Sequence, residues 1–225
     1  MGNDISIYAN HSIDFNNNDI EILANKIKES LDTFNIINLD KIKNQIRGYY
    51  DWQGYNDEHK NRWHKKIDDW KGNEWEFSID NDLKNYVTIN YFGPYSLNIS
   101  FTNKRIQFND PGCRYDSFFG MDKNDRIEWR LYYYQIIRLF GGNYALYLPD
   151  QGNVAWEFTE NISGYNIDLN IIIKGLIEKY GNNIIKIDDF SFDENNFIDT
   201  PYYFVDDFED IKNIFIKYKS RSNGI

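Results

Sequence analysis

The clearest strand pattern in this 225-residue chain is YVTINYFGPYSLNISFTNKRIQFN, residues 86–109. Apolar and polar side chains alternate in three short runs within it, which is the period of a half-buried β-strand. Gly93-Pro94 separates the first two runs and Asn103-Lys104 separates the last two, and both pairs are typical of turns. The segment of about residues 86–109 is therefore predicted to be a three-stranded antiparallel meander with one apolar face and one polar face.

Amphipathic helices are predicted on both sides of the meander, because apolar residues recur three or four positions apart. The first is expected over roughly 16 residues after a capping box at Asn18–Glu21. The other predicted helices cover residues 59–69, 125–140, 167–180 and about 207–219. Short strands are expected at 5–15, 144–148 and 184–187. Gly141-Gly142 is expected to end the predicted helix at 125–140.

The mixture of helices and antiparallel strands lacks the alternating order of parallel βαβ units. The sequence also shows neither an internal repeat nor a linker. We therefore expect one α+β domain over residues 1–225, an antiparallel sheet packed by several helices. Within it, a Trp-rich helical insertion is expected at about 49–77 and an acidic, aromatic segment at 188–210.

The formal net charge of −10 is concentrated in one place. Residues 188–210 carry nine acidic side chains without a single Lys or Arg, and the rest of the chain holds 26 acids and 25 bases. A nearly neutral body with one acidic segment argues against nucleic acid as a partner, because phosphates are neutralised by Lys and Arg. No apolar run is long enough to span a bilayer and the N-terminus does not resemble a signal peptide, so we expect a cytoplasmic protein that is not bound to a membrane.

Motifs for chemistry are not found in the sequence. His59 and His64 are five residues apart and would lie on different faces of a helix, so neither a metal site nor a cofactor is predicted. Cys113 is the single cysteine of the sequence, so an internal disulfide is excluded. The sequence places no His beside it that would activate it as a nucleophile. Oxygen-bearing side chains at 188–199 leave weak calcium binding open. Catalytic residues are not assigned, and an enzyme is not expected.

The aromatic side chains of residues 49–77 allow a second interpretation. Trp and Tyr can stack on sugar rings, so a carbohydrate- or small-ligand-binding protein, or an enzyme of unassigned class, stays open as the alternative function. Core packing or a protein interface is the commoner use of such residues. Trp52, Tyr55 and Trp63 are therefore secondary candidates for contact with a partner.

The acidic segment is the main candidate for a binding surface. Like charges held close together repel one another, and a basic partner would recover that energy and be attracted rapidly by the field. Seven aromatic residues lie among the carboxylates and can serve as anchors. The predicted partner-binding residues are Asp188, Asp189, Asp193, Glu194, Asp199, Tyr202, Tyr203, Asp206, Asp207, Glu209 and Asp210.

The stretch Phe140-Gly-Gly-Asn-Tyr-Ala-Leu-Tyr-Leu-Pro-Asp150 resembles a segment of uncharacterised bacterial proteins. The chain as a whole, small, acidic and rich in Trp and Tyr, resembles the immunity proteins of bacterial polymorphic-toxin and secreted-effector systems. This resemblance implies a one-to-one complex with a cognate toxin whose basic active-site or substrate surface is blocked. It carries no catalytic residues over to this chain.

Overall fold

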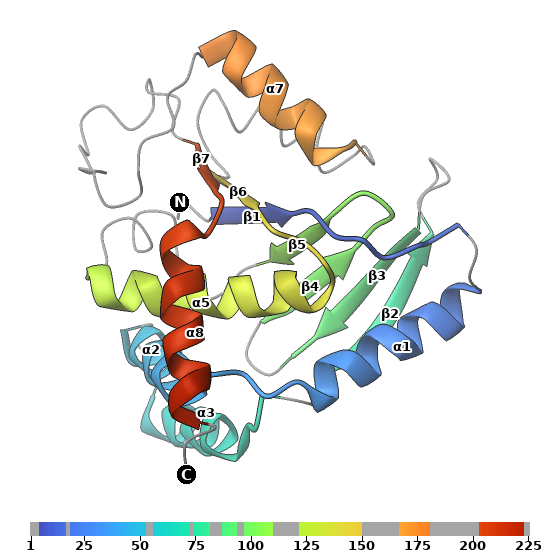
Figure 1. Cartoon of the computed structure of the whole chain (residues 1–225). Coiled ribbons are helices and arrows are strands. Elements are labelled where there is room, and N and C mark those ends of the chain that lie inside the picture. Colours follow the sequence, from blue (N-terminus) through green and yellow to red (C-terminus); the bar gives the residue numbers. More distant parts are fainter. Residues whose placement is uncertain are drawn as a thin grey trace.

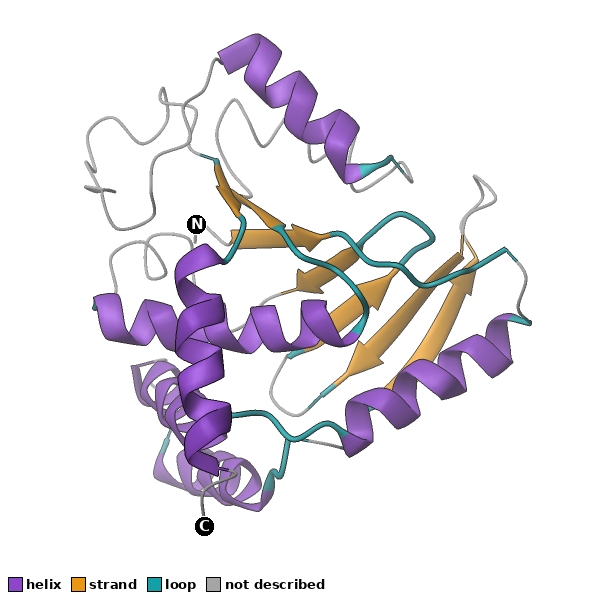
Figure 2. Cartoon of the chain, viewed as in Figure 1, coloured by secondary structure: helices purple, strands orange, loops and turns teal. Residues whose placement is uncertain are grey.

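The computed structural model describes residues 5–16, 19–52, 56–72, 74–81, 87–93, 97–109, 122–149, 167–180 and 203–222. These residues form a mixed α+β structure, as the sequence predicts, with helices packed on one antiparallel sheet (Figures 1 and 2). The predicted strand at 184–187 and the acidic residues at 188–202 lie outside the described residues.

The sheet has seven strands in the order β2-β3-β4-β5-β1-β6-β7. Strands β3, β4 and β5 are the predicted meander, and β2 extends it by one strand that the sequence analysis did not identify. Strand β1 joins the meander to the β6–β7 pair, and each neighbouring pair is antiparallel. The strands span Ile5–Ala9 (β1), Glu76–Asn81 (β2), Val87–Phe92 (β3), Asn98–Phe101 (β4), Ile106–Asn109 (β5), Ala145–Pro149 (β6) and Phe204–Asp206 (β7).

The helices agree with the predicted ones except at their ends and for α2, which was not predicted. Their bounds are Ile20–Thr33 (α1), Leu39–Trp52 (α2), Asp57–Asp69 (α3), Lys123–Leu139 (α5), Leu169–Tyr180 (α7) and Glu209–Ser222 (α8). The predicted caps were wrong for two of them. Asp19, rather than Asn18, caps α1, and Asp122 caps α5 three residues before the predicted start. In each case the Asp carboxylate accepts a hydrogen bond from a free amide of the first turn.

One face of the sheet carries the main core. Residues that stand opposite one another in the strand register form a continuous row across all seven strands: Phe77, Tyr91, Ile99, Phe108, Ile7, Tyr147 and Phe204. Helix α5 lies across this face, and α8 crosses over α5 (Figure 1). Trp129, Tyr132 and Tyr133 of α5 are buried and pack on one another as rings. Burying aromatic side chains of this size is a main source of the stability of the fold.

The opposite face of the sheet is divided into two parts. Helix α7 covers β1, β6 and β7, where Leu169, Ile172 and Leu176 pack against Tyr8 and Leu146. The same face carries Ser78, Asn90, Ser100 and Gln107 on β2 to β5, in one register row. Strands β1, β6 and β7 are buried on both faces, whereas the meander is buried on one face only. Apolar and polar residues therefore alternate cleanly only in the sequence of the meander.

The turn between α5 and β6 depends on glycine, as predicted. Gly141 has a φ of +77°, the left-handed conformation that ends many helices. A Cβ atom on Gly142 would lie 2.0 Å from the backbone oxygen of Asn10. The Asn10 side chain also accepts hydrogen bonds from the amides of Asn143 and Tyr144. This turn therefore fixes β6 against the end of β1.

Candidate functional site

Asp206 belongs to the acidic segment, and its place in the sheet explains why it is buried. It stands at the end of a second row of the core face, which runs Ile79, Ile89, Phe101, Ile106, Ala9, Ala145 and Asp206. Strand alternation therefore turns this carboxylate toward the core, where the residue is 1% exposed. A buried carboxylate at that position requires a cation close by.

Arg130 of α5 supplies the cation. Its Nε and Nη2 donate to the two carboxylate oxygens of Asp206 at 2.6 and 2.8 Å. Its Nη1 and Nη2 also donate to the two oxygens of Asp210 at 2.8 Å each. The Arg130 side chain is only 4% exposed. One guanidinium therefore holds the end of β7 and the first turn of α8 through two bidentate contacts, and we call this set of three residues the Arg130 clamp.

Neighbouring groups complete the surroundings of Asp206. The amide of Phe208 donates to its Oδ1 at 2.9 Å, and the Tyr147 hydroxyl donates to its Oδ2 at 3.4 Å. The Phe204 ring lies 5.9 Å from the guanidinium carbon of Arg130. Phe208 has a φ of 57°, an unusual conformation for a residue other than glycine. Its buried ring packs on Tyr134 at 5.3 Å, so packing and the clamp together hold this strained turn.

Electrostatics in the clamp follow from burial and close pairing. Burial opposes the charge on Arg130, yet the hydrogen bonds and attraction of Asp206 raise the pKa of its guanidinium above the ordinary value. Burial raises the pKa of Asp206, and the bonds from Arg130 and the Phe208 amide oppose that rise. For Asp210, burial acts in the same direction, but the Arg130 contacts outweigh it and lower the pKa. The paired, charged state is therefore the stable one near neutral pH.

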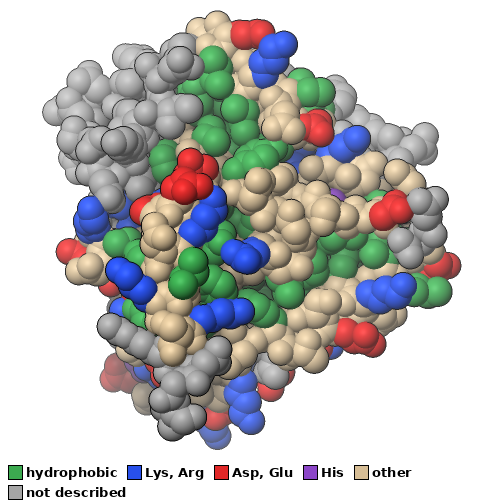
Figure 3. Space-filling model, in the orientation of Figure 1, with side chains coloured by type: hydrophobic (Ala, Val, Ile, Leu, Met, Phe, Trp, Pro, Cys, Tyr) green, Lys and Arg blue, Asp and Glu red, His purple; other side chains and the backbone are tan. Residues whose placement is uncertain are grey.

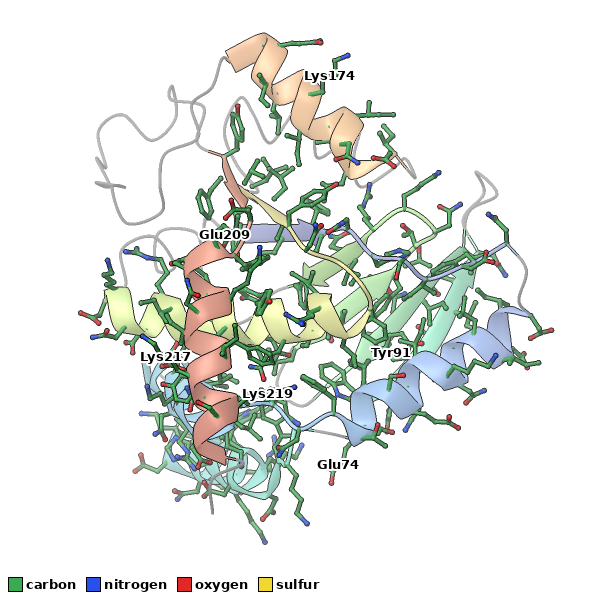
Figure 4. All side chains as sticks on the ribbon, viewed as in Figure 1. Glu74, Tyr91, Lys174, Glu209, Lys217 and Lys219 are labelled. Atoms are coloured by element: carbon green, nitrogen blue, oxygen red, sulfur yellow. The ribbon has the colours of Figure 1, made fainter. Side chains whose placement is uncertain are left out.

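Three carboxylates of the acidic segment face solvent at the clamp, one of them a member of it. Asp207 and Glu209 are exposed, and the Asp210 side chain is 53% exposed although it contacts Arg130. Figure 3 shows acidic side chains gathered where α8 begins, next to basic ones, and Figure 4 labels Glu209 there. Part of this arrangement has a local structural role. Asp207 accepts a hydrogen bond from the Glu209 amide at 3.1 Å, and carboxylates at a helix N-terminus interact favourably with its dipole.

Two of the predicted partner-binding residues do not lie on the surface. Asp206 is buried in the clamp, and Tyr203 is buried against α7 in the second cluster of apolar residues. The expectation that these two side chains meet a partner is therefore corrected, because both point into packed layers of the protein. The remaining predicted residues, Asp188, Asp189, Asp193, Glu194, Asp199 and Tyr202, lie outside the described residues, as does the calcium-binding possibility at 188–199.

The Trp-rich stretch contributes mainly to the core where it is described. Trp70 and Trp75 are buried, and the backbone amide of Trp75 donates to Asp32 of α1 at 3.1 Å. Trp63 of α3 is half-buried, with the Lys66 ammonium 5.3 Å from its ring centre. The side chain of Trp52 and all of Tyr55 lie outside the described part of the chain.

Within the described ranges, no three His, Cys, Asp or Glu side chains come together as they would around a metal ion. None of the described helices has the length and apolar character needed to cross a membrane.

Arg130 is the residue of the candidate site that was not predicted from the sequence. The sequence does contain a signal for it, because charged residues interrupt the apolar ones in this part of α5. The stretch 126–137 of α5 is buried throughout except for a partly buried Ile127, yet it contains Arg126, Glu128 and Arg130. Charged residues at such positions need partners from elsewhere in the chain. Glu128 has the partners Lys41 at 2.5 Å and Asn38 at 2.8 Å, just as Arg130 has Asp206 and Asp210. Sequence shows the need for partners but not which residues satisfy it.

Comparisons with protein-family models, with curated proteins and with solved structures gave no match to this chain.

Proposed function

We propose that this chain is an immunity-type binding protein, which neutralises a bacterial toxin by covering the toxin's basic active-site or substrate surface in a one-to-one complex. The observation that carries the proposal is the rigid presentation of acidic side chains at the start of α8. Asp207, Glu209 and Asp210 face solvent there, directly above the buried pair of Arg130 and Asp206. These acids belong to the segment that holds nearly all of the net negative charge.

Rigid placement matters for binding because ordering a surface on association costs free energy. The four charged hydrogen bonds of the Arg130 clamp have already ordered the turn from β7 into α8. Carboxylates on such a turn attract a basic partner and fix its orientation with little further ordering of the backbone. Lys212 contacts Glu209 at 2.6 Å, just as Arg130 contacts Asp206 and Asp210. The four carboxylates between residues 206 and 210 therefore meet two cations, and the turn keeps a net negative charge.

The alternative, a sugar- or ligand-binding protein built on residues 49–77, has weaker support. Trp70 and Trp75 are buried in the main core and are not available for stacking on a ligand. Trp63 is half-buried and packs against the same core. The proposal therefore places the partner surface at the acidic segment.

The proposal is tested first by co-purification of the chain with the product of the adjacent gene, expressed from the native operon. A stable one-to-one complex that protects cells from the neighbouring protein is expected. The interface is then tested with Asp207→Asn/Glu209→Lys, which leaves Asp206 and Asp210 to hold Arg130. Asn at 207 keeps a side-chain oxygen for the Glu209 amide.

The matched control is Asp57→Asn/Glu58→Lys, which makes the same charge change on two exposed residues in the first turn of α3. Calorimetry should give a Kd at least tenfold weaker for the α8 variant, a larger effect at low salt than at high salt, and an unchanged Kd for the control. Loss of binding in the α3 control alone would move the interface to the Trp-rich region. Unchanged binding in the α8 variant would refute the proposed surface.

A further inference from the structure

Strand β2, Glu76–Asn81, ends the sheet at the side opposite to β7 (Figure 1). Among the described strands it pairs with β3 alone, and helix α1 packs beside it on the core face. The N–H and C=O groups of alternate residues of β2 point to its other edge. Glu76, Asp80 and Asn81 are exposed, and the three residues between them are half-buried. An edge strand of this length is a template on which another extended chain can add by backbone hydrogen bonds.

The side chains on one face of this edge are acidic and fixed in place. Glu76 and Asp80 point to the same face, and strands β2, β3 and β4 contain no Lys or Arg. The Asn90 side-chain amide of β3 donates to Asp80, and the Ser100 hydroxyl of β4 donates to Asn90 at 2.7 Å. These bonds orient the Asp80 carboxylate while leaving its residue exposed. The edge therefore carries two negative charges without a basic residue on these three strands.

An exposed aromatic ring lies beside the first of these charges. Phe92 of β3 stands directly opposite Glu76 in the register and is 42% exposed. A basic side chain placed above this pair would meet a carboxylate and a ring face together, and both attract a cation. On the other face of β2, Phe77 and Ile79 are half-buried against the main core, so an apolar side chain placed there would extend that core.

We propose that the β2 edge binds an extended segment of a partner protein in which Lys or Arg alternates with apolar residues. The segment adds to the sheet as a strand beside β2. Its basic side chains lie over Phe92, Glu76 and Asp80, and its apolar side chains lie beside Phe77 and Ile79. Backbone hydrogen bonds supply most of the affinity, because exposed ion pairs contribute little, and the charges select the sequence and its register.

A second copy of this chain does not suit the edge. Two β2 strands side by side would bring four carboxylates together without a cation from β2, β3 or β4. The inference is also separate from the proposed function, because the acidic turn at α8 follows β7, at the other end of the sheet. Either surface can fail its test while the other passes.

The test uses the full-length protein and a synthetic peptide in which four Lys alternate with four Val. One control peptide has the same composition with the four Lys grouped together, and another replaces Lys with Glu. Backbone amide NMR is recorded during titration at low salt, and hydrogen exchange is measured with and without peptide. The alternating basic peptide should shift amides of β2 and slow the exchange of its outward-facing amides, and both control peptides should bind at least tenfold more weakly.

The variant Glu76→Gln/Asp80→Asn removes both charges and keeps an oxygen at residue 80 for the Asn90 amide. It should weaken peptide binding about two- to tenfold, because two exposed ion pairs are lost, whereas Asp57→Asn/Glu58→Gln on α3 should leave binding unchanged. Peptide-induced shifts confined to α8, equal binding of the grouped-Lys peptide, or no exchange protection in β2 would each overturn the inference. Concentration-dependent dimerisation through β2, seen by sedimentation, would overturn it as well. The mapping on the unmodified protein decides the question even if the variant does not fold.

Discussion

Replacing Arg130 with Met should destabilise the protein more than most single changes. Met fills a similar volume without charge, so the buried carboxylate of Asp206 loses two hydrogen bonds and its counter-ion at once. Asp210 loses its two bonds as well, but its side chain is 53% exposed and water can replace them. The cost therefore comes mainly from Asp206.

Breaking a buried ion pair by removing one partner costs about 3–5 kcal/mol, because an uncompensated charge stays behind. For a protein of this size, a loss of 1 kcal/mol lowers the melting temperature by about 2–4 °C. The expected fall is therefore about 6–20 °C. Arg130→Lys should recover only part of it, because one ammonium group cannot form two bidentate contacts.

The loss of stability in Arg130→Met should also depend on pH. Without Arg130, Asp206 is forced to bind a proton in the folded state, whereas the unfolded chain releases it above about pH 4. The folded variant then holds one more proton than the unfolded variant, so its stability falls by about 1.4 kcal/mol for each pH unit above that value. The deficit of Arg130→Met relative to the unmodified protein should therefore shrink as the pH is lowered from 7 toward 5.

Urea unfolding followed by Trp fluorescence measures these free energies, since the chain contains six Trp residues. The double variant Arg130→Met/Asp206→Asn should lose about 1–3 kcal/mol less than the sum of the two single variants. Asn keeps an acceptor for the Phe208 amide, so the comparison isolates the charge. A loss below 1 kcal/mol for Arg130→Met at pH 7, with an unchanged denaturant slope, would refute the assigned role of the pair.

Three further predictions concern other parts of the fold. Gly142→Ala should lower the free energy of unfolding by at least about 2 kcal/mol in urea, because its Cβ would meet the Asn10 backbone oxygen. Gly48→Ala in α2, where the added Cβ meets open space, should raise it by about 0.5–1 kcal/mol. Burial lowers the pKa of His11, so its contribution to stability is present above about pH 6.5 and is lost as the pH falls. The melting temperature of His11→Gln should therefore change less between about pH 7 and pH 5 than that of the unmodified protein. Glu128→Gln should cost about 1–3 kcal/mol, measured in the same way, and an unchanged stability would contradict the contact with Lys41.

Local sequence patterns were sufficient for most of the fold. The alternation in residues 86–109 predicts three strands of the sheet, and the turn residues between them predict their antiparallel order. Helical spacing likewise locates α1, α3, α5, α7 and α8 to within a few residues. Such patterns can be read because side chains on one element share one environment, and the periods of helices and strands differ. The cap of α1 was misplaced by one residue because Asn18 and Asp19 have similar capping preferences.

The contacts of the candidate site, unlike the helices and strands, do not follow from local sequence patterns. The sequence alone shows that residues 188–210 carry nine carboxylates and no base, and that α5 carries charged residues among apolar ones. In the folded protein, Arg130 of α5 pairs with Asp206 of the acidic segment, a contact that the sequence does not reveal. Arg130 and Asp206 are 76 residues apart, and their meeting depends on β7 adding to the edge of the sheet beneath α5. Strand register and the packing of helices on the sheet determine which carboxylate is buried and which is exposed. Neither can be deduced from local sequence preferences.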